Sequence, residues 1–134
     1  MSQPLRLGIA GLGTVGVGVI KIIRKQAALL QARTGREIKI SAVSARSKGR
    51  ERGVALASYA WEDDPVDLAK RDDVDVFVEL MGGADGPAKV ATEAAIAAGK
   101  HVITANKAML AMHGHALAQS AEAKGVSLRY EAAV

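Results

Sequence analysis

A glycine-rich segment near the amino terminus constrains the fold of this chain more than any other feature. Residues 5–18 read LRLGIAGLGTVGVG, in which a short apolar run leads through the pattern G-x-G-x-x-G into a helical pattern. Gly11 permits a tight turn, Gly13 leaves room for close approach to the backbone, and Gly16 lets helix and strand pack closely. Free N–H groups of the first helical turn then suit an anion. The segment predicts a dinucleotide-binding turn, the alternative being a turn that only packs a helix on a sheet.

The rest of the chain alternates predicted strands and helices. Strands are expected at 5–10, 38–45, 74–81, 101–105 and from 126 onward. Helices are expected at 14–33, 65–71, 87–98 and 106–124, the last broken near Gly114, while 53–61 fits a short helix and a short strand. This order predicts an α/β fold with a Rossmann-type doubly wound, mostly parallel sheet and helices on both faces. At 134 residues, the chain is expected to form one domain over 1–134.

Composition excludes several classes of function. The chain has no cysteine, which excludes disulfides, thiolate zinc sites and a cysteine nucleophile. No stretch approaches the ~20 apolar residues of a membrane span, and the amino terminus lacks a signal-peptide pattern. A cytoplasmic protein is therefore expected, without membrane partners. The net charge is +4, but aromatic residues make up only 3%, so the stacking platforms typical of single-strand nucleic-acid binding are missing.

The segment after the second predicted strand indicates which dinucleotide is preferred. NAD-binding sites place an acidic residue there, against the ribose hydroxyls. This chain instead has Arg46, Ser47 and Lys48, and a guanidinium can bind a 2′-phosphate with two charge-assisted hydrogen bonds. Glu37 has the expected separation from the glycines, but it lies at the start of the strand, at the wrong end of the sheet. The pattern predicts NADP as the preferred cofactor and NAD as the second option; a solvated basic loop is the alternative.

Two more segments are expected at the same edge of the sheet. Gly82 and Gly83 follow a strand predicted to lie beside the first, where backbone can approach a cofactor; a plain turn fits equally. Residues 104–107, Thr-Ala-Asn-Lys, close the next strand. Lys107 can orient a carbonyl or carboxylate, or stabilise alkoxide charge, with a surface lysine as the alternative. Glu79 is read only as a polar interruption of an apolar strand.

Together these segments resemble the amino-terminal NAD(P)-binding domain of homoserine dehydrogenase. The matching stretches are GIAGLGTVGVGV at 8–19, VDVFVELMGG at 74–83, GKHVITANKA at 99–108 and YEAAV at 130–134. The glycine motif alone is shared by many dehydrogenases, whereas Thr-Ala-Asn-Lys combined with Tyr-Glu-Ala is far more specific. The resemblance covers essentially the whole chain.

The resemblance implies an oxidoreductase that interconverts L-homoserine and L-aspartate 4-semialdehyde, in threonine, methionine and isoleucine biosynthesis. It implies that Lys107 is catalytic, and that Glu131 and Val134 help to hold a monovalent cation, sodium, in the complete enzyme. Motif and resemblance together place these residues at the cofactor: Gly11, Gly13, Thr14, Val15, Gly16, Arg46, Ser47, Lys48, Met81, Gly82, Thr104 and Lys107.

In that family the chain continues into a substrate and dimerisation domain, which is absent from this sequence. We therefore expect this chain alone to bind the dinucleotide but to turn over little or nothing. The small-molecule substrate and a homodimer belong with the missing domain. Two alternatives stay open: a free-standing NADP-binding module without catalysis, and a related enzyme such as an aspartate dehydrogenase.

Overall fold

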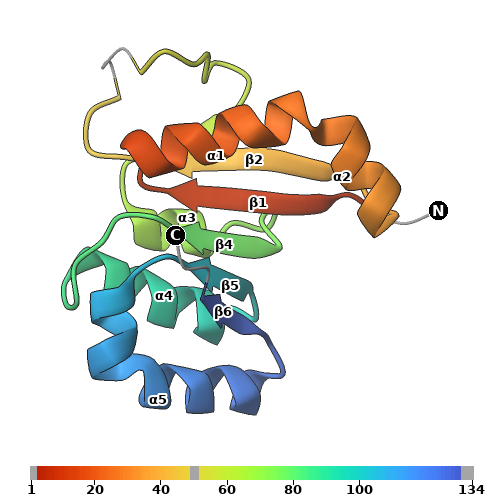
Figure 1. Cartoon of the computed structure of the whole chain (residues 1–134). Coiled ribbons are helices and arrows are strands. Elements are labelled where there is room, and N and C mark those ends of the chain that lie inside the picture. The colour runs from red at the N-terminus through yellow and green to blue at the C-terminus, as the bar shows by residue number, and fades with distance from the viewer. Residues whose placement is uncertain (1–2, 49–51, 131–134) are drawn as a thin grey trace.

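The described part of the chain is built around a parallel β-sheet (Figure 1). The computed structural model describes residues 3–48 and 52–130. The strands are β1 Leu5–Ala10, β2 Ile38–Ser44, β3 Ala60–Glu62, β4 Val76–Glu79, β5 His101–Thr104 and β6 Leu128–Tyr130. They lie in the order β3-β2-β1-β4-β5-β6, and every neighbouring pair is parallel. The predicted fold class is confirmed, and the sheet is parallel throughout the described strands.

Helices cover both faces of this sheet (Figure 1). They are α1 Thr14–Lys25, α2 Ala27–Thr34, α3 Pro65–Ala69, α4 Pro87–Ala97 and α5 Lys107–Lys124. On one face, Ile20 of α1 is packed in a cluster with Leu7, Ile9, Ile40, Val43, Val76 and Val78. On the other, Phe77 and Val102 share a cluster with Leu68 of α3, with Ala88, Ala91 and Ala95 of α4, and with Met109 and Leu117 of α5. Alternate residues of the central strands therefore face opposite layers.

Three predicted helices differ from the observed ones. The short helix expected within 53–61 does not form, since only turns and the start of β3 lie there. The single helix expected over 14–33 divides at Gln26, whose φ of −111° and ψ of 19° are not helical. α2 has no buried residue, so no core contact keeps it in line with α1. The break expected near Gly114 is also wrong, because α5 runs through it. One glycine costs a helix only about 1 kcal/mol, and the buried side chains of Met109 and Leu117 hold both halves.

The turn after β1 depends on two of the motif glycines. Gly11 has a φ of 103°, and a Cβ there would lie 2.6 Å from the carbonyl oxygen of Leu80. A Cβ on Gly16 would overlap the carbonyl oxygen of Gly11. Helix α1 and strand β1 thus approach so closely that only glycine fits at position 16, as predicted.

At the opposite end of the sheet, an ion pair joins β1 to the segment before β4. The Arg6 guanidinium donates to both Asp75 carboxylate oxygens, at 3.0 and 2.9 Å, and the Arg6 backbone N–H donates to Asp75 Oδ2 at 2.9 Å. These hydrogen bonds, above all those from the guanidinium, hold the pKa of Asp75 below its ordinary 3.8. The same contact raises the pKa of Arg6.

The Asp75 contact predicts a specific pH dependence of stability. Because its folded-state pKa is lowered, its contribution is complete above the ordinary aspartate pKa and disappears as the pH falls through the folded value. We expect Asp75→Asn to unfold at lower urea concentration than the unchanged chain at pH 7, and the difference to shrink below about pH 4. Urea titrations at both pH values measure it. A difference of equal size at pH 7 and pH 3 would contradict the assignment.

The turn geometry predicts opposite effects for two glycines of the same helix. Gly16→Ala should lower the free energy of unfolding by about 1–3 kcal/mol, because its methyl group has no space. A Cβ on Gly18 would meet no atom within 4 Å, so Gly18→Ala should raise stability by about 0.5–1 kcal/mol through helix propensity. Urea or thermal unfolding of both variants gives the comparison, and similar effects for the two would refute the close approach.

Candidate functional site

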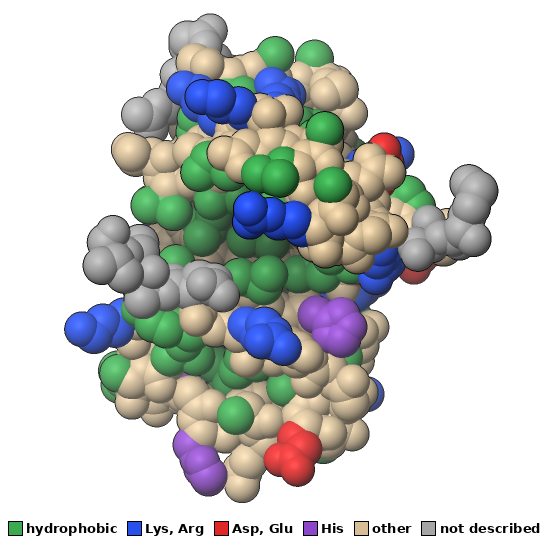
Figure 2. Space-filling model, turned by 45° about the vertical axis from the view of Figure 1, so that its right-hand side comes forward, with side chains coloured by type: hydrophobic (Ala, Val, Ile, Leu, Met, Phe, Trp, Pro, Cys, Tyr) green, Lys and Arg blue, Asp and Glu red, His purple; other side chains and the backbone are tan. Residues whose placement is uncertain are grey.

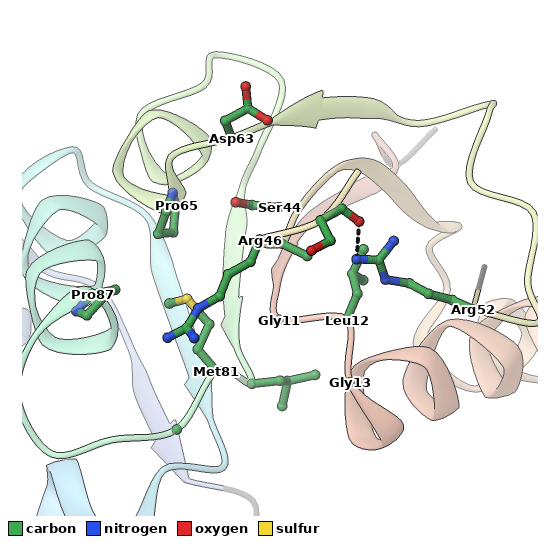
Figure 3. Close-up of a pocket in the computed structure, with 14 residues that line it drawn as sticks. Gly11, Leu12, Gly13, Ser44, Arg46, Arg52, Asp63, Pro65, Met81 and Pro87 are labelled. Atoms are coloured by element: carbon green, nitrogen blue, oxygen red, sulfur yellow. Dashed lines mark hydrogen bonds between the residues drawn. The ribbon is translucent and has the colours of Figure 1, made fainter. Parts of the chain in front are cut away.

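A cavity of about 570 Å³ opens at the carboxyl edge of the sheet (Figure 3). The turn after β1, the loop after β2 and the turn after β4 form most of its wall. Six of the residues predicted at the cofactor line it: Gly11, Gly13, Arg46, Ser47, Met81 and Gly82. In open α/β sheets, ligands bind outside the carboxyl ends of the strands where the strand order reverses. The cavity lies at that position, at the carboxyl end of β1 and between the ends of its two neighbours in the sheet, β2 and β4.

The first turn of α1 is suited to an anionic group. Its N-cap, Gly13, makes no side-chain hydrogen bond, and the first turn contains no acidic residue. The N–H groups of Thr14, Val15 and Gly16 have no acceptor within the helix, since the ladder starts with Val17 N–H donating to Gly13 at 2.9 Å. A Cβ on Gly13 would point into open space. The unfilled space and the free donors therefore fit a diphosphate, which the positive end of the helix dipole would also favour.

Basic side chains follow β2 at the side of the cavity. Arg46 is exposed, and its side chain extends across the cavity towards Met81 (Figure 3). The Arg52 guanidinium donates to the backbone oxygen of Ser47 and lies over the Trp61 ring, 5.6 Å from its centroid. Lys48 is exposed and outside the cavity lining. The face shown in Figure 2 has Lys and Arg side chains spread over it and few acidic ones, in keeping with the net charge of +4.

The carboxylate of Glu79, which the sequence did not single out, organises the turn after β4. It is fully buried at the end of that strand. Glu79 Oε2 accepts from the N–H groups of Met81 at 2.7 Å and Gly82 at 3.1 Å. Oε1 accepts from the Thr104 hydroxyl at 2.6 Å. A lone acid at the end of a buried apolar strand, directly before Met-Gly-Gly, is the sequence signal that identifies it.

Thr104 and Asn106 extend this network to the start of α5. Thr104 is fully buried and does not line the cavity. Its hydroxyl donates to Glu79 Oε1 and accepts from the Asn106 N–H at 2.9 Å. Asn106 caps α5 by accepting from Met109 N–H at 3.0 Å, and its amide donates to the Gly83 oxygen at 2.6 Å. Lys107, the first residue of α5, is exposed at the same edge but is not part of the cavity wall.

The predicted cation ligands, Glu131 and Val134, lie outside the described residues. Within 3–48 and 52–130, no three His, Asp or Glu side chains come together as a metal cluster. His113 instead pairs with Asp85, at 2.7 Å between Nε2 and Oδ1. No helix in these two ranges has the length and apolar character needed to cross a membrane.

Comparison with known sequences places the chain in one family. Residues 11–131 match the family model described as "Homoserine dehydrogenase, NAD binding domain". The chain is 45% identical over 132 residues to homoserine dehydrogenase of Neisseria gonorrhoeae, and 40% identical to that of Mycobacterium tuberculosis. Each match covers 98% of this chain but only 30% and 29% of the relative. The chain therefore spans less than a third of the length of these relatives.

Solved structures give the same result. A structure of S. aureus homoserine dehydrogenase matches with a TM-score of 0.90 and 36% identity, covering 100% of this chain and 33% of that one. The enzyme from Thiobacillus denitrificans matches with a TM-score of 0.89 and 36% identity, covering 97% and 30%. The chain belongs to the family of homoserine dehydrogenase NAD-binding domains.

Proposed function

We propose that this chain binds NADP in the cavity at the carboxyl edge and serves as the cofactor-binding part of a homoserine dehydrogenase. The family supports a nicotinamide dinucleotide as ligand, and the position of Arg46 carries the choice of NADP. When bound, the nicotinamide ring accepts or donates a hydride. The chain's own residues hold the dinucleotide: the first turn of α1 binds the diphosphate, and the loop after β2 binds the adenosine ribose.

The charges around the adenosine ribose favour a 2′-phosphate. Residues 45–48, which follow β2, contain no carboxylate that would repel it. Among the described residues, the charged side chains that line the cavity are two arginines, Arg46 and Arg52, and one carboxylate, Asp63. The backbone oxygen of Glu37 accepts from Leu5 N–H at the start of β1, so this acid lies at the other end of the sheet. The Arg46 guanidinium presents paired donors to the cavity. Each charge-assisted hydrogen bond contributes about 1.5–3 kcal/mol, enough for a tenfold or larger preference.

The proposed reaction of the whole protein is the interconversion of L-homoserine and L-aspartate 4-semialdehyde. Lys107 lies at the same edge of the sheet, directly after Asn106, the N-cap residue of α5, whose amide donates to the Gly83 oxygen in the turn after β4. Its ammonium group is proposed to orient the substrate carbonyl or to stabilise alkoxide charge. The sodium ion with Glu131 and Val134, the cofactor role of Lys48, the homodimer and the cytoplasmic location stay predictions from the sequence.

Replacing Arg46 tests the preference for NADP. Calorimetric titration of the unchanged chain should give tighter binding of NADPH than of NADH. Arg46→Ala should weaken the binding of NADPH by about tenfold or more, because it removes the donors to the 2′-phosphate. It should change the affinity for NADH by less than about threefold.

Arg33→Ala is the matched control, because it removes the same charge from exposed α2, at the opposite end of β2. It should leave both affinities within about twofold. Equal binding of NADPH and NADH, unaffected by Arg46→Ala, would reject the NADP assignment while leaving the family intact.

A further inference from the structure

Glu79 has no role in the binding scheme above, yet it is the one acidic side chain of the described core that is fully buried. Burying a carboxylate is unfavourable unless its oxygens are hydrogen-bonded. Here both oxygens accept from donors, and two of these donors, the N–H groups of Met81 and Gly82, belong to the cavity wall. Glu79 thus fixes part of the wall from behind, without lining the cavity itself.

The third donor connects this wall to the neighbouring strand. Glu79 and Thr104 are directly paired in the β4–β5 register, so their side chains emerge on the same face. Thr104 accepts from the Asn106 N–H while donating to Glu79, and the Asn106 amide returns to the Gly83 oxygen. The turn after β4 is therefore held at both ends by one closed set of hydrogen bonds.

This network lies on one half of the cavity. The adenosine ribose of a dinucleotide belongs over the end of β2 and the diphosphate at α1, so the nicotinamide half extends over β4 and β5. We propose that Glu79, itself held by Thr104, is a positioning residue for the nicotinamide half of the site and leaves the adenosine half unaffected. The inference rests on the proposed dinucleotide binding, which it deepens.

Two substitutions of Thr104 separate hydrogen bonding from packing. Thr104→Val keeps the shape of the side chain but removes the hydroxyl, leaving Glu79 Oε1 and the Asn106 N–H without their partner. Thr104→Ser keeps the hydroxyl and removes a buried methyl group. Both variants lose some stability, so stability alone does not distinguish them. Only the valine variant removes the hydrogen bond that holds Glu79 Oε1 and, through Glu79, the turn after β4.

The test compares NADPH with adenosine 2′,5′-bisphosphate, which contains the adenosine half but no nicotinamide. Measured by calorimetry, Thr104→Val should weaken the binding of NADPH by about tenfold, the effect of one charge-assisted hydrogen bond. It should leave the affinity for the bisphosphate within about twofold. Thr104→Ser should retain the NADPH affinity of the unchanged chain. Glu79→Gln, which removes the charge and one acceptor, should show the same selective loss of NADPH affinity to a smaller degree. It replaces Thr104→Val in the test if that variant does not fold.

A second readout needs no ligand. Amide hydrogen exchange at Met81 and Gly82, followed by NMR, should be faster in Thr104→Val than in Thr104→Ser. The inference is overturned if the two Thr104 variants behave alike, if the bisphosphate and NADPH weaken equally, or if the unchanged chain binds NADPH no more tightly than the bisphosphate. Failure of the unchanged chain to bind either ligand would instead reject the proposed function and, with it, this refinement.

Discussion

The close approach of Gly16 to the carbonyl group of Gly11 is the contact on which the candidate site depends. It places the first turn of α1 directly beyond the end of β1, next to the cavity wall at Gly11 and Gly13, with N–H groups that have no acceptor within the helix. A side chain on Gly16 would push the helix away from the strand, and one on Gly11 would overlap the Leu80 carbonyl group in the turn after β4. Helix position, anion-binding donors and cavity shape therefore follow from one steric constraint, and the parallel sheet supplies the other walls at the same edge.

These walls have different physical characters. On the β2 side, an exposed arginine and polar backbone face the cavity, which suits a phosphate that stays partly solvated. On the β4 side, the turn is held by a buried carboxylate, a buried hydroxyl and a cap residue. The first side can adapt to its ligand, whereas the second is fixed before any ligand arrives, as orientation of a reactive ring requires.

Local patterns in the sequence were sufficient for the fold and for part of the site. The glycine spacing and the apolar strands each depend on neighbouring residues, and the structure confirms them. The break at Gln26 and the continuity of α5 depend on tertiary packing that periodicity does not report. The partnership of Glu79 with Thr104 depends on the register of two strands 25 residues apart. The burial of Thr104 beneath the turn depends on the same register, and its place beside the cofactor stays a prediction.

The most direct test of the account is a crystal structure of this chain with NADPH. We expect the diphosphate oxygens within hydrogen-bond distance of the first-turn N–H groups of α1, the 2′-phosphate on the Arg46 guanidinium, and the nicotinamide over the turn at Met81 and Gly82. A 2′-phosphate turned away from Arg46 into solvent would remove the basis of the NADP preference. A dinucleotide bound away from the carboxyl edge would contradict the account as a whole.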